Sequence, residues 1–202
     1  MPKQLSPVEV VCEVRKLQYL FQLKQVIRYN EQRSATDSTE SVAEHIYGMQ
    51  VLARYFLPLE SKRYSFDEQE ISQMILWHDI DEVEVGDMLG YKKTAADLKR
   101  EEQAEQTVIE KAPDTLGPEL QKVLAAYRDQ ATAEARFVKA IDKFEPLVQL
   151  YNEKGKRLIQ HNGTTVEESL AIKTPYLEGF PDIKHFCLTL HTVMEEEGYF
   201  CG

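Results

Sequence analysis

Residues 75–87, ILWHDIDEVEVGD, join the end of an apolar run to two adjacent ionisable residues, His78 and Asp79. Apolar positions recur at helical spacing from residue 66 onward, which predicts a helix that ends near this pair, followed by a short loop through residues 85–87. Such a helix places the two side chains at the margin of a hydrophobic core, where ionisable groups need partners. We therefore expect other polar side chains of the chain to meet them there.

The sequence on both sides of this stretch is also helical in pattern. Capping boxes at residues 6–9 (SPVE) and 41–44 (SVAE) begin helices that we expect to run to about Arg28 and Pro58, with a polar loop over 29–40 between them. Further helices are predicted over 95–112, 118–130, 132–151, from 165 onward, and over 181–197. No alternating strand pattern or hairpin is found. The sequence therefore predicts an all-α fold, a bundle of about seven or eight helices.

Charge and cysteine content limit the classes of function. The 202 residues include 34 Asp and Glu against 24 Lys and Arg, a formal net charge of −10. Nucleic acid polymers and anionic membrane surfaces attract positively charged proteins, so neither is an expected partner. The widely spaced Cys12, Cys187 and Cys201 suit a reducing compartment, and no apolar run approaches the length of a membrane span. With no signal-peptide pattern either, we expect a cytoplasmic protein.

His45 and Asp142 are the candidate partners of His78 and Asp79. His45 lies in the first turns of the helix that follows the second capping box, and Asp142 lies in a later predicted helix. Two imidazoles and two carboxylates on three helices form a coherent set of nitrogen and oxygen ligands for a metal ion. Four protein ligands on an octahedral ion leave one position for an activated water and one for a phosphate oxygen, as hydrolysis requires. The alternative is that each residue is an ordinary buried polar group bonded to the backbone.

Three blocks of sequence occur in a fixed order along the chain. They are SVAEH at 41–45, WHDIDEVEVGD at 77–87 and AEARFVKAIDKFE at 133–145. Together they resemble the HD-domain metal-dependent phosphohydrolases, most closely the 5′-deoxynucleotidase branch of that family. The resemblance covers about residues 10–160. It implies a single HD domain over 1–202, with this stretch as its core and C-terminal helices over 164–198.

The resemblance also implies a role for individual residues. The metal ligands would be His45, His78, Asp79 and Asp142. Glu82 would be the catalytic glutamate, because it lies close to the metal and can order the attacking water or protonate the leaving oxygen. Asp87 would lie near the sugar of the substrate. The family's loop arginine, which holds phosphate oxygens and assists catalysis, corresponds to Arg33, with Arg28 as the alternative.

The implied cofactor is one divalent metal ion. Residues 80–141 contain no histidine, whereas relatives that bind two metal ions generally carry extra histidines in this interval. The ligand set suits manganese, iron, cobalt or nickel, and zinc and magnesium are further options.

The predicted function is therefore that of an enzyme that removes the 5′-phosphate of (deoxy)nucleoside monophosphates. Three alternatives stay open: an HD hydrolase of another small phosphate ester or nucleotide, a module that binds metal or nucleotide without catalysis, and a helical scaffold in which the motifs are accidental. The chain departs from the family pattern at Ser34 and over 88–93, both in the expected nucleotide pocket. Relatives are commonly dimers, so we expect a homodimer, to which the apolar face of the first helix can contribute.

Overall fold

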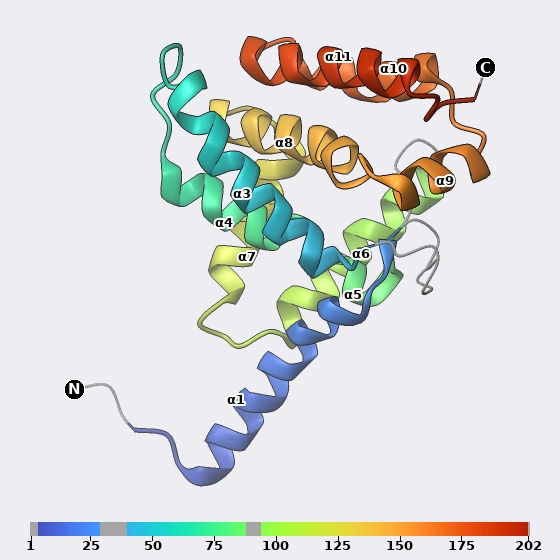
Figure 1. Ribbon diagram of the computed structural model, residues 1–202. Helices are drawn as coiled ribbons and strands as arrows, with labels where there is room; N and C mark the ends of the chain where they lie inside the picture. Colours follow the sequence, from blue (N-terminus) through green and yellow to red (C-terminus); the bar gives the residue numbers. More distant parts are fainter. Residues whose placement is uncertain (1–3, 29–39, 88–93, 202) are drawn as a thin grey trace.

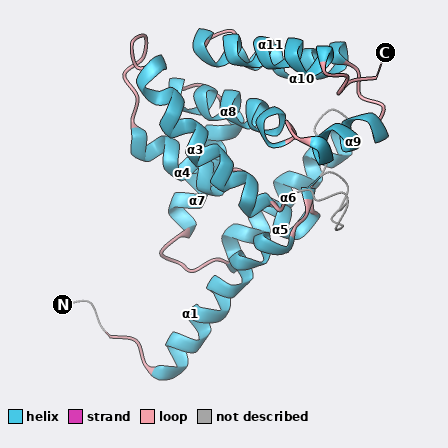
Figure 2. Cartoon of the chain, viewed as in Figure 1, coloured by secondary structure: helices cyan, strands magenta, loops and turns pink. Residues whose placement is uncertain are grey.

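The computed structural model describes residues 4–28, 40–87 and 94–201 (Figure 1). In these ranges short connections join the helices, and the only β-type pairing is an isolated bridge between Ile27 and Ser41 (Figure 2). The helices are α1 (Pro7–Leu20), the 3-10 helix η1 (Phe21–Gln25), α3 (Val42–Glu60), α4 (Glu68–Trp77), α5 (Glu82–Val85), α6 (Ala95–Lys111), α7 (Gly117–Asp129), α8 (Ala133–Gln149), α9 (Glu153–His161), α10 (Val166–Leu177) and α11 (Pro181–Glu196). The predicted all-α class is confirmed. None of the described helices combines the length and the apolar content that crossing a membrane requires.

Side-chain caps begin several helices at the predicted residues. Ser6, Ser41 and Thr165 each form a capping box with the glutamate at the third helical position, and the Thr132 side chain accepts a hydrogen bond at the start of α8. Each cap satisfies main-chain amides that have no partner within the helix. The predicted starts of α1, α3, α8 and α10 are therefore confirmed.

The end of the first helix differs from the sequence expectation. α1 stops at Leu20 rather than near Arg28, and the chain tightens into η1 before it becomes extended at Val26. There the Val26 carbonyl accepts a hydrogen bond from the Val42 amide at 2.9 Å, and the Arg28 amide donates to the Glu40 carbonyl at 3.0 Å. This pairing removes the backbone near Arg28 from the helical ladder and fixes that residue beside the start of α3.

The described residues form more helices than the seven or eight expected, and two short helices account for most of the difference. The four-residue α5 forms from Glu82 to Val85, where a loop was expected to begin. The helix predicted over 132–151 is followed by a separate helix, α9, whose N-cap is Asn152. Gly155 explains the close turn between them, because a Cβ at this position would lie 2.1 Å from the Leu150 carbonyl oxygen.

α8 is the central helix of the fold. It packs against α3, α4 and α7 and is covered by α10 and α11 (Figure 1). Its Phe137, Val138 and Ile141 side chains are completely buried and belong to a hydrophobic core shared with α3 and α4. Because Asp142 follows Ile141, this packing brings the carboxylate close to the helices that carry the two candidate histidines.

Candidate metal centre

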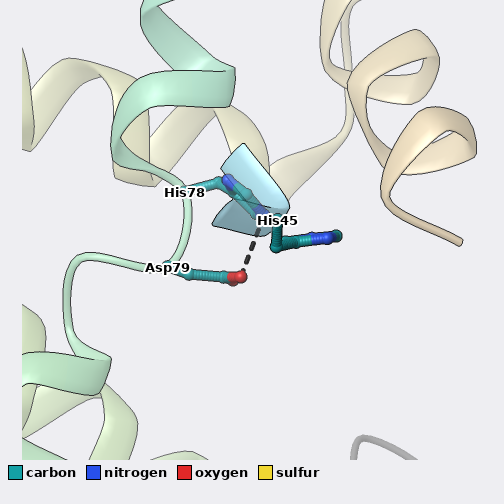
Figure 3. Close-up of side chains that lie close together, drawn as sticks. All are labelled: His45, His78 and Asp79. Carbon is teal, nitrogen blue, oxygen red and sulfur yellow. Dashed lines mark ion pairs between the residues drawn. The ribbon is translucent and has the colours of Figure 1, made fainter. Parts of the chain in front are cut away.

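Three helices deliver the four predicted ligands to one region. His45 lies in the second turn of α3, His78 is the C-cap residue of α4, and Asp142 lies in the middle of α8. His45, His78 and Asp79 each offer a ligand atom, and these atoms lie within 4.8 Å of one another (Figure 3). Asp142 joins them through His45, whose Nε2 atom is 3.5 Å from the Asp142 Oδ1 atom. The structure therefore brings the four residues together.

The two histidines present unsatisfied ring nitrogens to this point. Within the described residues, Nε2 of His45 and Nε2 of His78 are buried and have no hydrogen-bond partner. The other ring nitrogen of His78 donates to the Ile75 carbonyl at 3.1 Å, which leaves the lone pair on Nε2. An orphaned buried acceptor is costly unless something binds it. Two imidazole lone pairs beside two carboxylates fit a divalent cation.

Asp142 is held by three donors on one of its two oxygens. Tyr127 donates a hydrogen bond to Oδ2 at 2.9 Å, and the Nζ atoms of Lys139 and Lys143 lie 3.2 Å and 3.1 Å from the same oxygen. Burial alone would raise the pKa of Asp142, but the lysine charges hold it well below its usual range. The ionised carboxylate therefore keeps Oδ1 directed at His45.

Charges on both sides of His45 determine its protonation. Burial and the positive charge of Arg28 oppose protonation, but the nearby carboxylates of Asp142 and Glu145 outweigh them and raise the pKa of His45 to about 9. Burial likewise opposes ionisation of Asp79, yet the adjacent His78, 3.0 Å away, lowers the pKa of that carboxyl. Opposite charges thus converge at this point, and a divalent cation that binds there would displace the proton from Nε2 of His45.

Glu82 lies beside this group at the start of α5. Its Oε2 atom is buried, with no hydrogen-bond partner in the described ranges. Burial raises the pKa of Glu82 well above its usual value, and the charges of Asp79 and Asp87 add to the effect. A carboxyl whose pKa is raised in this way is suited to give or take a proton during a reaction.

Arg28 is a third cation at the site, on the side of His45 and Glu145. Its Nη1 atom is 2.6 Å from Glu40 Oε1 and 3.7 Å from Glu145 Oε2, and its Nε atom is 3.8 Å from Asp87 Oδ1. The side chain is only 12% exposed. The sequence-based assignment of the phosphate contact to Arg33 concerns a residue outside the described ranges, so it stays a prediction.

A cleft of about 1330 Å³ opens beside these residues and includes His78 and Glu82 in its lining. Lys139 and Lys143 of α8 lie on it, and carboxylates of α6 supply acidic groups to the same cleft. The volume is sufficient for a small organic ligand. The remaining lining residues that carry charge or an aromatic hydroxyl are Asp81, Lys99, Glu101, Glu102, Glu105, Tyr127, Arg128 and Tyr176.

Several of these groups were not identified from the sequence. Tyr127, Lys139, Lys143 and Glu145 all contact the predicted ligands, and no role was assigned to any of them, although the last three lie in the 133–145 block. Lys139 lies three residues before Asp142 and Glu145 three residues after it, which places both about one helical turn from that carboxylate. That spacing was the available signal.

The fold and the centre agree with a match to a known family. The HD domain family profile matches residues 20–184, which is most of the chain. The chain therefore belongs to the HD domain family. The family resemblance predicted from the three sequence blocks is confirmed.

Individual relatives carry more specific names than the family does. The chain is 32% identical over 135 residues to the 5′-deoxynucleotidase HDDC2 of Bos taurus, covering 66% of this chain and 63% of that protein. It is 33% identical over 140 residues to the protein of the same name from Xenopus laevis, covering 67% of each. The chain thus spans about two thirds of the length of these curated relatives.

Solved structures show the same fold. A protein described as a predicted metal-dependent phosphohydrolase from Magnetospirillum magnetotacticum MS-1 aligns with a TM-score of 0.78 at 23% identity, over 96% of this chain and 98% of that one. An HD-domain phosphohydrolase from Listeria innocua aligns with a TM-score of 0.60 at 19% identity, over 91% of this chain and 86% of that one.

The His and Asp cluster within an HD domain suggests that this chain binds a divalent metal ion.

Proposed function

We propose that this protein is a metal-dependent phosphohydrolase that removes the 5′-phosphate of (deoxy)nucleoside monophosphates. The observation that carries the proposal is the convergence of two unsatisfied imidazole nitrogens and two carboxylates beside a cleft that His78 and Glu82 line. The names of the relatives, 5′-deoxynucleotidases, support the nucleotide as substrate.

The metal ligands in this proposal are Nε2 of His45, Nε2 of His78, and carboxylate oxygens of Asp79 and Asp142. A bound divalent ion would supply Lewis acidity toward a phosphate oxygen and lower the pKa of a water molecule. Manganese, iron, cobalt or nickel suits this mixed set, with zinc or magnesium as alternatives. The protein's own contribution is to hold the four side chains in place through the packing of α3, α4 and α8.

Arg28 would bind phosphate oxygens through its planar guanidinium, since the described structure places it 3.8 Å from Asp87 and beside His45's partner Glu145. Asp87 would then accept a hydrogen bond from the sugar next to that phosphate. Arg33 keeps the same role as an untested alternative. The position of Arg28 among the site residues supports its role in phosphate binding, whereas the case for Arg33 rests on the sequence resemblance.

Glu82 would transfer the proton in this mechanism. A protonated carboxyl at the edge of the cleft can donate to the leaving 5′-oxygen, and the carboxylate can accept a proton from the attacking water. The same feature weighs against a module that binds metal or nucleotide without catalysis, because such a module has no use for a buried, unpartnered acid.

We also propose a homodimer located in the cytoplasm. Val10, Val14 and Leu17 follow one face of α1, and Phe21, its C-cap residue, continues the series, at intervals of four, three and four; the four side chains are 37–54% exposed. This is the spacing of a two-helix seam, and α1 extends from the body of the protein (Figure 1). Cys12, Cys187 and Cys201 are free thiols, which suits a reducing compartment.

The proposed function is tested by elemental analysis of the purified protein together with phosphate release from ribo- and deoxyribonucleoside monophosphates. We expect a divalent metal and metal-dependent phosphate release from the monophosphates, and the panel should include nucleoside diphosphates and non-nucleotide phosphate esters. Phosphate release only from the diphosphates or the non-nucleotide esters would show that the substrate is not a nucleoside monophosphate. A nucleotide recovered intact after long incubation with metal would favour the binding module instead.

A further inference from the structure

Glu145 contacts the candidate ligand His45 from the side opposite the site. It lies one turn after Asp142 on α8, and its Oε2 atom is 2.7 Å from the Nδ1 atom of His45. Both side chains are buried, with 0% and 5% of their surface exposed. A carboxylate can only accept a hydrogen bond, so this contact requires the proton to be on Nδ1.

This contact determines which nitrogen of His45 can bind an ion. With the proton on Nδ1, the lone pair of the neutral imidazole is on Nε2, the buried atom that lacks a hydrogen-bond partner among the described residues. His78 reaches the same tautomer by donating to the Ile75 carbonyl of its own helix. His45 instead depends on a side chain from another helix.

The α3 helix makes room for this carboxylate at Gly48. A Cβ at position 48 would lie 2.5 Å from the Oε1 atom of Glu145. Gly48 follows His45 by three residues, just as Glu145 follows Asp142 by three, so the two helices contact each other in two successive layers. One layer holds the candidate ligands, and the next holds the carboxylate that supports them.

The same carboxylate also faces Arg28. Oε2 of Glu145 is 3.7 Å from Nη1 of Arg28, which in turn is 2.6 Å from Glu40 Oε1. Glu40 lies 3.6 Å from Nδ1 of His45, farther than Glu145 does. Arg28 therefore neutralises the two carboxylates next to His45, and Glu145 is the one in hydrogen-bond contact with it.

We propose that Glu145 is a positioning residue that fixes the ring orientation and tautomer of His45 for metal binding and ties Arg28 to the same point. The inference rests on the proposed function insofar as His45 is taken as a metal ligand. Acceptors behind metal-bound histidines typically change metal affinity by 10- to 100-fold when they are removed.

The test is Mn²⁺ affinity of the full-length, metal-stripped protein, measured by calorimetry. We expect Glu145→Ala to weaken binding by about 10- to 100-fold and Glu145→Gln, whose amide oxygen still accepts from Nδ1, to stay within about threefold of wild type. Gly48→Ala should weaken binding too, because the new methyl group displaces the carboxylate. Glu60→Ala is the matched control, since Glu60 is also a buried carboxylate and its partners lie far from the site: the amides of Asp182 and Ile183, and the Arg63 side chain.

Wild-type affinity in a folded Glu145→Ala protein would overturn the positioning role. If that variant does not fold, the His45 tautomer can be read in wild-type protein loaded with diamagnetic Zn²⁺ by long-range ¹H–¹⁵N correlation. A proton on Nδ1 is expected, and metal on Nδ1 would overturn the inference. These readouts measure metal binding, so they test the role of Glu145 separately from the proposed function. Failure of the proposed function would instead appear as normal metal affinity without phosphate release.

Discussion

The Tyr127 hydroxyl donates a hydrogen bond to the Oδ2 atom of Asp142 at 2.9 Å and accepts one from Lys139 at the same distance. The ring also lies against His78, with centroids 5.1 Å apart. Tyr127 thus joins the helix α7 to candidate ligands on α4 and α8. It holds one carboxylate oxygen of Asp142 and so determines which oxygen faces His45.

The substitution Tyr127→Phe keeps the ring but removes this donor. We expect a loss of about 1 kcal/mol in the free energy of unfolding, typical of one hydrogen bond, and a reduction in Mn²⁺ affinity of up to about tenfold. Urea denaturation and calorimetry would measure the two effects. Tyr151→Phe is a suitable control, because its hydroxyl bonds to the exposed Glu197. Equal metal affinity in both variants would show that Tyr127 does not orient Asp142.

The four candidate ligands should each be necessary for metal binding. We expect the alanine substitutions at His45, His78, Asp79 and Asp142 to abolish stoichiometric metal content, because each removes one of only four protein donors. Elemental analysis after purification without added metal would measure this. Melting temperatures should fall as well where bound metal stabilises the wild type by mass action. Unchanged metal content in three of the four variants would show that these residues do not form the metal site.

The sequence predicted those parts of the fold that depend on local signals. Capping residues such as Ser41 and Thr132 act within one turn, and the apolar period of α8 indicates its buried face without knowledge of its neighbours. The predicted end of α1 was wrong because the observed end depends on pairing between Val26 and Val42, which are far apart in the sequence. Local pattern carries no information about such a contact.

The same distinction applies to the candidate site. His78 and Asp79 were found because they are adjacent, and His45 and Asp142 because they belong to motifs of fixed order. The role of Glu145 was not predicted, because it depends on the space that Gly48 leaves on a helix about one hundred residues earlier in the sequence. The structure brings the four predicted ligands together, and their role as ligands stays a prediction until metal content is measured.

Substrate binding should distinguish Arg28 from Arg33. Arg28 is fixed at the site by Glu40 and lies 3.8 Å from Asp87, so we expect Arg28→Ala to raise KM for a deoxynucleoside monophosphate by at least about tenfold. Arg33→Ala should change KM less. Steady-state kinetics on both variants, with circular dichroism to confirm folding, would measure this. A larger effect of Arg33→Ala would instead support the alignment inferred from the sequence.

A histidine away from the site should make stability depend on pH. Nδ1 of His191 donates to the Cys187 carbonyl at 2.8 Å, and Nε2 accepts from the Ser169 hydroxyl, which itself accepts from Lys173. Burial lowers the pKa of His191 to about 4, below the value of about 6.5 in an unfolded chain. The unfolded state therefore binds the proton first as pH falls, so stability is complete above about pH 6.5 and is lost toward pH 4.

The variant His191→Gln isolates this effect. Between pH 7.5 and 5, wild-type protein should lose about 2 kcal/mol more of its free energy of unfolding than the variant does, as measured by urea denaturation. His161→Gln is the control, because His161 is exposed. Parallel curves for wild type and His191→Gln would show that His191 titrates alike in the folded and unfolded chain.

Glu82→Gln separates a catalyst from a binding module. The amide preserves the size of the side chain and much of its hydrogen bonding, so metal content and nucleotide affinity should stay near wild type. The variant cannot transfer the proton, so kcat should fall by about 10²- to 10⁴-fold. Elemental analysis, nucleotide binding and phosphate release on the same preparation would measure all three. Loss of metal would make Glu82 a fifth ligand. Turnover at the parental rate would move the proton transfer to Asp87, one of the acids whose charges act on Glu82.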